Sequence, residues 1–214
     1  MDSRLLDRLA AEAAAGPPPS ADVAAAVRRM AIGFAAAATL ALGWLGLRQD
    51  IAVASATPFF WVKLTFPVTL ALLAGWAVWR SAHPGRSARE PLVGLAAVVL
   101  LFWIVTLMRP LAGVSDIDWE VDLWGRTWRE CALYIALMAL PMWLPAMAWI
   151  RRWGPVRPRL AGSLVGLCCG TLSAALYALH CRESGMAFLG LWYLAGASVP
   201  AVLGAILGRR WLGW

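Results

Sequence analysis

The sequence predicts an all-α integral membrane protein, a six-transmembrane-helix bundle with both termini in the cytoplasm. Three observations support this fold class: an excess of apolar residues, six long runs almost free of charge, and an uneven distribution of basic residues. Of the 214 residues, 61% are hydrophobic and 14% are charged, whereas soluble domains are about 45–50% apolar and about 25% charged. The composition therefore excludes a water-soluble globular protein, and it excludes a disordered chain, which needs low hydrophobicity and high charge.

Each apolar run is long enough to cross a membrane, because a core of about 30 Å needs roughly 20 residues of helix. The approximate limits of the runs are 30–47, 60–78, 92–108, 131–150, 160–179 and 187–207. Lys63 is the one charged residue inside a run, and we expect its long side chain to extend to the membrane surface. This division leaves residues 1–29 as a cytoplasmic segment and residues 30–214 as a membrane domain.

The distribution of basic residues predicts the orientation of the bundle. With the N-terminus inside, thirteen Lys and Arg residues lie on the cytoplasmic side and six lie on the outer side. Short loops rich in Lys and Arg stay in the cytoplasm. The net charge of +7 is then explained by the cytoplasmic face of a membrane protein, and no direct contact with nucleic acid is needed to explain it.

The sequence of residues 1–29 predicts a short amphipathic helix followed by a stiff, proline-rich tether. The apolar edge of the helix and the basic residues beside it are Leu5, Leu6, Leu9, Arg4 and Arg8. The run Gly16-Pro17-Pro18-Pro19 ends this helix, because proline lacks the N–H that a helix needs. Such a helix can lie on the inner leaflet of the bilayer, or it can dock onto a cytoplasmic protein.

Small residues and prolines in the runs predict how the helices pack. Gly162, Gly166 and Gly170 have GxxxG spacing, as do Gly204 and Gly208. Such faces allow two helices to approach closely. Prolines inside the runs predict local kinks, and two of them lie in the fourth run at positions 141 and 145.

The loop at residues 109–130 alternates acidic residues with tryptophans. It does not have the glycine and the final glutamate of a calcium-binding loop. We therefore expect a hydrated acidic loop whose tryptophans rest on the lipid headgroups.

The four cysteines fall into two pairs by their expected depth. Cys168 and Cys169 are near the middle of the fifth run, where a free cysteine behaves as a small hydrophobic residue. Cys131 opens the fourth run and Cys181 follows the fifth, so we expect both at the outer surface. A disulfide persists in an oxidising compartment, and it requires Cα atoms within about 7 Å.

Three further polar residues stand beside the outer cysteines in the sequence: Glu130, His180 and Glu183. With Cys131 and Cys181 they offer thiolate, imidazole and carboxylate groups, which suit a soft or borderline metal such as zinc or cadmium. The spacing contains neither CxxC nor HxxxH, so it leaves a metal or redox site and a purely structural role both open. No motif requires a cofactor. The one ligand that we consider is a transient metal ion at the outer cysteines.

Other function classes find less support. Ion-coupled transporters usually carry a buried carboxylate, His or Arg in the membrane, and the runs contain none. No nucleophile–base pair is present, so we do not expect an enzyme. The alternatives that stay open are a membrane thiol-disulfide oxidoreductase that uses Cys131 and Cys181, and a small-solute transporter.

Short motifs along the chain carry a resemblance to a known family. They are Gly46-Leu47-Arg48, Trp128-Arg129 ahead of Cys131, Arg157-Pro158-Arg159-Leu160-Ala161-Gly162, Tyr177-Ala178-Leu179-His180-Cys181, Leu191-Trp192-Tyr193 and Leu207-Gly208-Arg209-Arg210. With these motifs the whole chain resembles the NrsF family. That family consists of six-span membrane proteins that act as negative regulators of sigma-F-type extracytoplasmic-function (ECF) sigma factors.

The resemblance implies an anti-sigma factor in the bacterial inner membrane. Its cytoplasmic N-terminal segment would hold an ECF sigma factor, with Leu5, Leu6, Leu9, Arg4 and Arg8 as the contact residues. Cys131 and Cys181 match the two cysteine positions that the family links with the response to heavy metals or oxidative stress. The family pattern His-Cys-Pro-Glu reads here as His180-Cys181-Arg182-Glu183, so an arginine replaces the proline.

Overall fold

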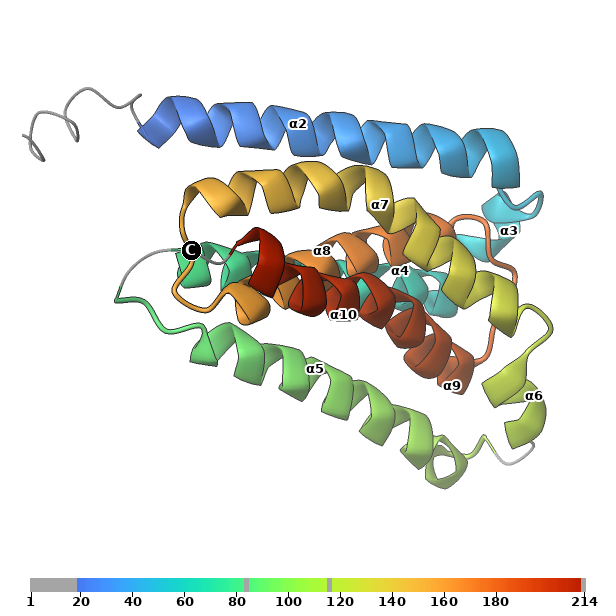
Figure 1. Ribbon diagram of the computed structural model, residues 1–214. Coiled ribbons are helices and arrows are strands. Elements are labelled where there is room, and N and C mark those ends of the chain that lie inside the picture. The colour runs from blue at the N-terminus through green and yellow to red at the C-terminus, as the bar shows by residue number, and fades with distance from the viewer. Residues whose placement is uncertain (1–18, 83–84, 115–116, 213–214) are drawn as a thin grey trace, which may run out of the picture.

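The computed structural model describes residues 19–82, 85–114 and 117–212, and within these ranges all regular structure is helical (Figure 1). The long helices are α2 (Pro19–Leu40), α4 (Pro58–Ala82), α5 (Arg89–Met108), α7 (Trp128–Arg152), α8 (Pro158–Ala178) and α10 (Leu194–Trp211). The short ones are η1 (Ala41–Leu45), α3 (Ile51–Ala54), η2 (Arg109–Ala112), α6 (Trp119–Trp124), α9 (Met186–Phe188) and η3 (Leu189–Tyr193). The all-α prediction is confirmed.

Five helical segments are long and apolar enough to cross a membrane. They are Pro58–Ala82, Arg89–Ala112, Trp119–Arg152, Pro158–Ala178 and Met186–Trp211. These segments correspond to the second to sixth predicted runs, with limits that differ by a few residues, and they make the protein a multi-pass membrane protein. The first predicted run, 30–47, lies in α2 and η1, which are not among the five. The sixth span and the orientation of the termini stay predictions.

Helix α8 is the centre of the bundle and packs against α4, α7 and α10 (Figure 1). Its contact with α10 is made by backbone. A Cβ atom at Gly170 would lie 2.6 Å from the carbonyl oxygen of Ala197, and a Cβ at Gly166 would overlap the carbonyl of Pro200. The two backbones therefore touch directly, and the close packing predicted from the GxxxG spacing is confirmed.

Helix α2 runs beside α7 and packs mainly against it (Figure 1). At this contact a Cβ atom on Gly33 would lie 2.5 Å from the carbonyl oxygen of Pro141. That carbonyl has no partner four residues later in α7, because Pro145 has no N–H to donate. The two prolines thus leave a free carbonyl on α7, and a glycine in α2 allows the helices to meet at that point.

On another side, α2 is separated from α4 and α8 by a cavity of about 460 Å³. The cavity lining is mostly apolar and includes Phe34, Met142, Cys168 and Cys169. Cys169 is buried among apolar side chains, as a small hydrophobic residue would be. The cavity leaves α7 as the main support of α2.

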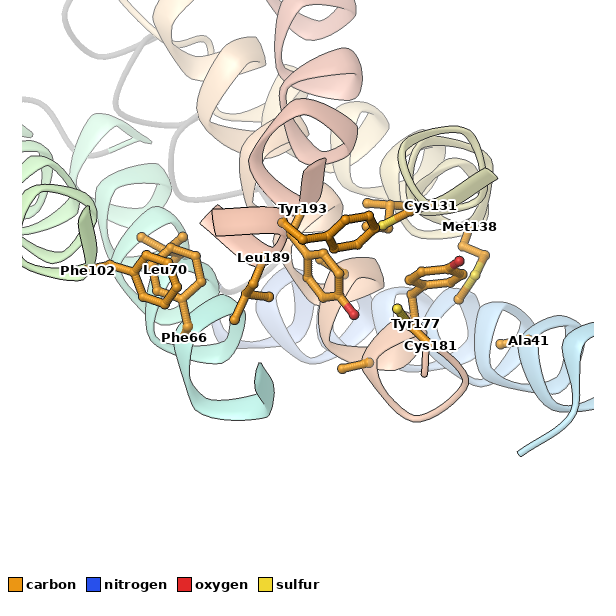
Figure 2. Close-up of a cluster of buried hydrophobic side chains, with 14 of the residues drawn as sticks. Ala41, Phe66, Leu70, Phe102, Cys131, Met138, Tyr177, Cys181, Leu189 and Tyr193 are labelled. Carbon is orange, nitrogen blue, oxygen red and sulfur yellow. The ribbon is translucent and has the colours of Figure 1, made fainter. Parts of the chain in front are cut away.

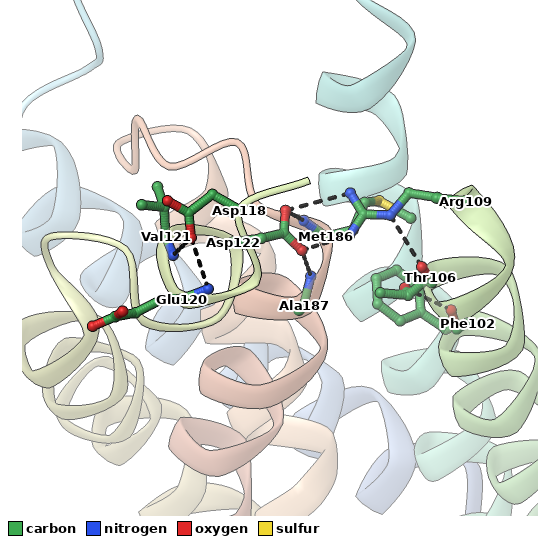
Figure 3. A network of polar contacts seen from close by, with 9 residues as sticks. All are labelled: Phe102, Thr106, Arg109, Asp118, Glu120, Val121, Asp122, Met186 and Ala187. Atoms are coloured by element: carbon green, nitrogen blue, oxygen red, sulfur yellow. Dashed lines mark hydrogen bonds and ion pairs between the residues drawn. The ribbon is translucent and has the colours of Figure 1, made fainter. Parts of the chain in front are cut away.

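The loop between α5 and α7 is folded, whereas a hydrated loop was expected. Asp118 caps α6 by accepting the N–H groups of Glu120 and Val121 at 3.1 and 3.2 Å (Figure 3). Such caps satisfy N–H groups that have no partner inside the helix. Asp122 pairs with Arg109 and accepts the N–H groups that begin α9 (Figure 3). Asp118 therefore begins α6, and Asp122 connects η2 with α9.

The tryptophans of this loop pack on the bundle as well. Trp124 and Trp128 lie with ring centroids 5.5 and 4.6 Å from the ring of Trp192. The indole N–H of Trp192 donates to the carbonyl of Leu123 at 2.9 Å. The rings of Trp124, Trp128 and Trp192 therefore pack against one another and hold the loop on the bundle.

The first prediction concerns the glycine contact between α8 and α10. We expect Gly166→Ala to lower the free energy of unfolding by about 1–3 kcal/mol, because overpacking in a close contact costs that much. The matched control is Gly43→Ala, since nothing lies within 4 Å of a Cβ at Gly43. Thermal unfolding in detergent, followed by helical circular dichroism, compares them. Equal stability of the two variants would contradict the direct backbone contact.

Candidate functional site

Cys131 and Cys181 belong to one cluster of buried side chains (Figure 2). Cys131 lies in the first turns of α7, and Cys181 follows the end of α8. Their exposed fractions are 0% and 3%, and both thiols are free. The sequence predicted both at the outer surface, but the structure buries them because the folded loops of this end cover them.

Two tyrosines complete what we call the cysteine cluster: Cys131, Cys181, Tyr177 and Tyr193 (Figure 2). The rings of Tyr177 and Tyr193 meet edge to face with centroids 6.1 Å apart. Tyr193 ends the π-helical segment η3, and π-helical turns are frequent at functional sites. Its hydroxyl is buried and has no hydrogen-bond partner among the described residues.

Lys63 lies beneath the cluster and is buried, with 1% of its surface exposed. Its ammonium group donates to the carbonyl oxygens of Cys181 and Glu183, each at 2.8 Å. It also lies 5.9 Å from the centroid of the Tyr193 ring. The expectation that Lys63 extends to the membrane surface is wrong. The chain leaves the helical pattern after α8, so these two carbonyls need donors, and Lys63 supplies them.

The segment 179–183, which we call the sensor loop after the role that we propose for it below, is also bonded to the end of η1. His180 Nδ1 lies 3.0 Å from the carbonyl oxygen of Gly46. The Arg48 N–H donates to the carbonyl of Leu179 at 3.3 Å, and its guanidinium reaches the carbonyl of Cys181 at 3.5 Å. The sensor loop therefore connects α8 with the segment that follows α2 and η1.

An ion pair orients Arg48 for this contact. Its guanidinium donates to both carboxylate oxygens of Asp50, at 2.9 and 2.8 Å. These bonds lower the pKa of Asp50 to about 2 and raise the pKa of Arg48 above its ordinary value. Both groups are therefore charged at neutral pH.

Glu183 holds the turn that precedes α7. Its Oε1 accepts the N–H of Arg126 at 2.9 Å and the hydroxyl of Thr127 at 3.1 Å. Gly125 has a φ of 55°, a conformation that favours glycine, and a Cβ there would lie 2.8 Å from Glu183 Oε2. The carboxylate thus fastens the sensor loop to the start of the helix that carries Cys131.

The five residues predicted as metal ligands do not converge on one point. Among the described residues, no group of three or more His, Cys, Asp and Glu side chains could hold a metal ion. Glu130 is exposed, while His180 contacts Gly46 and Glu183 holds the turn before α7.

The predicted sigma-factor contacts lie outside the described residues. They are Leu5, Leu6, Leu9, Arg4 and Arg8. The described part of the chain begins with Pro19, the first residue of α2, and α2 continues without a break past Arg28 and Arg29.

Comparison with known proteins decides the family. A family model described as "Negative regulator of sigma F" matches residues 9–214. The chain belongs to the NrsF family. It is 36% identical over 212 residues to the probable anti-sigma-F factor NrsF of Azospira oryzae, covering 98% of each chain. It is 37% identical over 215 residues to the anti-sigma-F factor NrsF of Caulobacter vibrioides, again covering 98% of each.

Membership of the NrsF family confirms the resemblance, and it makes the protein a regulator and not an enzyme. No solved structure matches the chain. The geometry of the cysteine cluster therefore comes from this chain alone.

Several residues of the NrsF site were missed by sequence reasoning. Arg48 and Tyr177 stand inside the motifs that carry the family resemblance, and Tyr193 ends another, but no role was assigned to them. Lys63 gave the clearest signal, because an ionisable residue inside an apolar run is by default a candidate functional residue.

A second prediction tests the role of Glu183. We expect Glu183→Ala to free the turn before α7, because the N–H of Arg126 and the hydroxyl of Thr127 lose their shared acceptor. Limited digestion with trypsin should then cut faster after Arg126 and Arg129, as local opening becomes easier. The control is Glu120→Ala, because Glu120 is exposed on α6. Equal rates of cutting in both variants would show that Glu183 does not fasten this turn.

Proposed function

We propose that this NrsF protein holds an ECF sigma factor at the bacterial inner membrane and releases it when Cys131 and Cys181 are modified by heavy metals or oxidants. Its NrsF relatives are named anti-sigma-F factors, which supports the first half of the proposal. The second half rests on one observation. The sensor loop, which carries Cys181, is bonded to the end of the first helix, and that helix leads to the N-terminal segment.

The proposal places six spans in the membrane, with α2 and η1 as the first and both termini in the cytoplasm. The basic residues support this topology, since thirteen lie on the side of the termini and six on the other side. The packing of Gly33 on Pro141 also places α2 against a membrane-spanning helix. The cysteine cluster then faces the periplasm, an oxidising compartment.

The N-terminal segment is the proposed docking site for the sigma factor. Its leucines form an apolar edge with arginines beside it: Leu5, Leu6, Leu9, Arg4 and Arg8. An amphipathic helix of this kind lays its apolar edge in a groove of a partner protein. The sigma factor, not this protein, contacts nucleic acid when it is released.

Two chemical reactions can modify the cysteine pair: oxidation to a disulfide and binding of a soft metal ion. A two-electron oxidant accepts two electrons from the thiols, both protons leave, and a bond forms between the two Sγ atoms. A soft metal ion such as cadmium displaces both protons and binds the two thiolates. Either change moves the sulfur atoms of two buried residues.

Movement of Cys181 displaces the sensor loop and weakens its bonds to Gly46 and Arg48. Helix α2 then loses its support at this end, and α7 is left as its main contact. A tightly packed interface responds by changing between discrete arrangements. A coupling free energy of about 1–3 kcal/mol, typical of allosteric proteins, is enough to release most of the bound partner.

The alternatives are less favoured by the structure. A thiol-disulfide oxidoreductase must admit a dithiol substrate to its cysteines, but Cys131 and Cys181 are both buried. No observation in the described residues favours a transport pathway for a small solute.

A third prediction tests the docking segment. We expect the full chain in nanodiscs to retain an ECF sigma factor of its host, whereas a chain of residues 30–214 loses it. The control is a full chain in which Arg151 and Arg152, exposed at the cytoplasmic end of α7 in this topology, are replaced by Gln. Equal retention by the truncated chain would refute the docking role of residues 1–29.

A fourth prediction tests the cysteines. We expect cadmium or a mild oxidant to weaken binding of the sigma factor to the full chain about 5- to 150-fold, the range that corresponds to ordinary allosteric coupling. Cys131→Ser and Cys181→Ser should bind the sigma factor with unchanged affinity but lose this response. Cys168→Ser is the matched control and should keep it. A response that survives in Cys181→Ser would contradict the proposal.

A further inference from the structure

A groove lined by three arginines opens between the starts of α5 and α8, far from the cysteine cluster in the sequence. Its volume is about 800 Å³. The arginines are Arg86, Arg89 and Arg157, and the lining also includes apolar side chains such as Leu92 and Leu160. None of the described lining residues is acidic. We call this space the arginine groove.

The three guanidinium groups of the arginine groove form no ion pair with a carboxylate in the described ranges. The carboxylate of Glu90, which lies next to the groove in the sequence, is bound to Arg80 at 2.7 Å. Arg86 lies over the ring of Trp79, with its guanidinium carbon 4.6 Å from the ring centroid. This contact orients the side chain and leaves its charge without an anion. Like charges that line one groove produce a positive potential, which attracts a negatively charged ligand.

An apolar cavity continues the arginine groove along α5. It has a volume of about 420 Å³, and Ala96 lines both spaces. The other side chains that line it are apolar and come from α4, α5, α8 and α10: Leu70, Leu95, Val99, Leu100, Leu167 and Leu194. All four helices belong to segments that are long and apolar enough to cross a membrane. The combined space therefore has a basic end and an apolar part at membrane depth.

The apolar cavity exists because α5 packs on one neighbour. Helix α5 packs mainly against α4 (Figure 1), where a Cβ atom at Gly94 would lie 3.2 Å from Leu73. In the segment Arg89–Ala112, 22% of the apolar stretch is buried, the lowest share among the five membrane-spanning segments. An apolar cavity excludes water. Inside a bilayer, the apolar group that is available to fill it is the acyl chain of a lipid.

We propose that the arginine groove and the apolar cavity together bind one anionic phospholipid, with its phosphate among the arginines and an acyl chain along α5. A guanidinium donates paired, charge-assisted hydrogen bonds to phosphate oxygens, and the acyl chain covers the apolar lining. In the topology proposed above, this end of the bundle faces the cytoplasm, where basic pockets between membrane helices bind anionic headgroups. The inference goes beyond the anti-sigma role and uses no residue of the cysteine cluster.

Native mass spectrometry of the full chain in an uncharged detergent tests the basic half of the site. The chain is titrated with phosphatidylglycerol or with phosphatidylcholine of the same acyl chains, and the bound lipids are counted. We expect one phosphatidylglycerol to bind in preference to phosphatidylcholine. Replacing both Arg89 and Arg157 by Gln should weaken its binding about 25-fold, because each basic residue beside an anionic lipid contributes about fivefold. The matched control replaces the exposed Arg209 and Arg210 by Gln, at the same end of the bundle, where Gly208 contacts the start of α8.

A second pair of variants tests the apolar half of the site. Ala96→Phe places a ring where the arginine groove joins the apolar cavity, and we expect it to weaken the binding of phosphatidylglycerol about tenfold, a typical effect of overpacking. The control is Ala97→Phe, since Ala97 is the next residue of α5, is exposed and lines neither space. Helical circular dichroism checks that all variants are folded. A free phosphate would need the arginines alone, so its binding would not respond to Ala96→Phe.

Four results would overturn the proposal. They are equal binding of the two lipids, an equal loss in both double arginine variants, unchanged binding in Ala96→Phe, and a dimer of the chain that phosphatidylglycerol does not dissociate. The third result would assign the groove to a free anion, and the fourth would assign it to a second copy of the chain. Because the assay contains neither a sigma factor nor a thiol reagent, any of them would leave the anti-sigma and sensing proposals to their own tests.

Discussion

The structure depends on how the sensor loop satisfies its backbone carbonyls. The chain leaves helical geometry after α8, and the carbonyls of Leu179, Cys181 and Glu183 have no helical partner. Lys63 binds two of them from α4, and Arg48 binds Leu179 and reaches Cys181 from the first helix. Buried carbonyls left without donors would be costly. A loop of five residues therefore fixes the relative positions of three helices and the burial of both cysteines.

The same contacts explain why a change at the cysteines can reach the first helix. Helices α8 and α10 touch through backbone and cannot shift without clashes at Gly166 and Gly170. Helix α2 is different, since it rests on α7 at Gly33 and borders a cavity of about 460 Å³. In the proposed mechanism, a disturbance at the sensor loop passes to α2, the element with the weakest support. Allosteric coupling requires an element with two arrangements, and α2 is our candidate for that element.

The sequence was sufficient for the helices because each apolar run needs only its own residues to form one. The GxxxG contact and the NrsF family were also predictable, since both depend on short patterns that are visible in the sequence itself. The site was only partly predictable. Its contacts join residues that are far apart in the sequence. Lys63 binds the carbonyl of Cys181, Glu183 binds Thr127, and Asp122 caps α9. Each depends on loops folding over the bundle, and no local pattern contains that information.

The claim that the sensor loop controls the first helix is tested most directly by hydrogen–deuterium exchange of the full chain in nanodiscs. Exchange is measured for residues 19–50 before and after cadmium or a mild oxidant is added. Our account predicts faster exchange in α2, η1 and residues 46–50 after modification, and no change in Cys181→Ser. Unchanged exchange in these residues, under conditions that release the sigma factor, would contradict it.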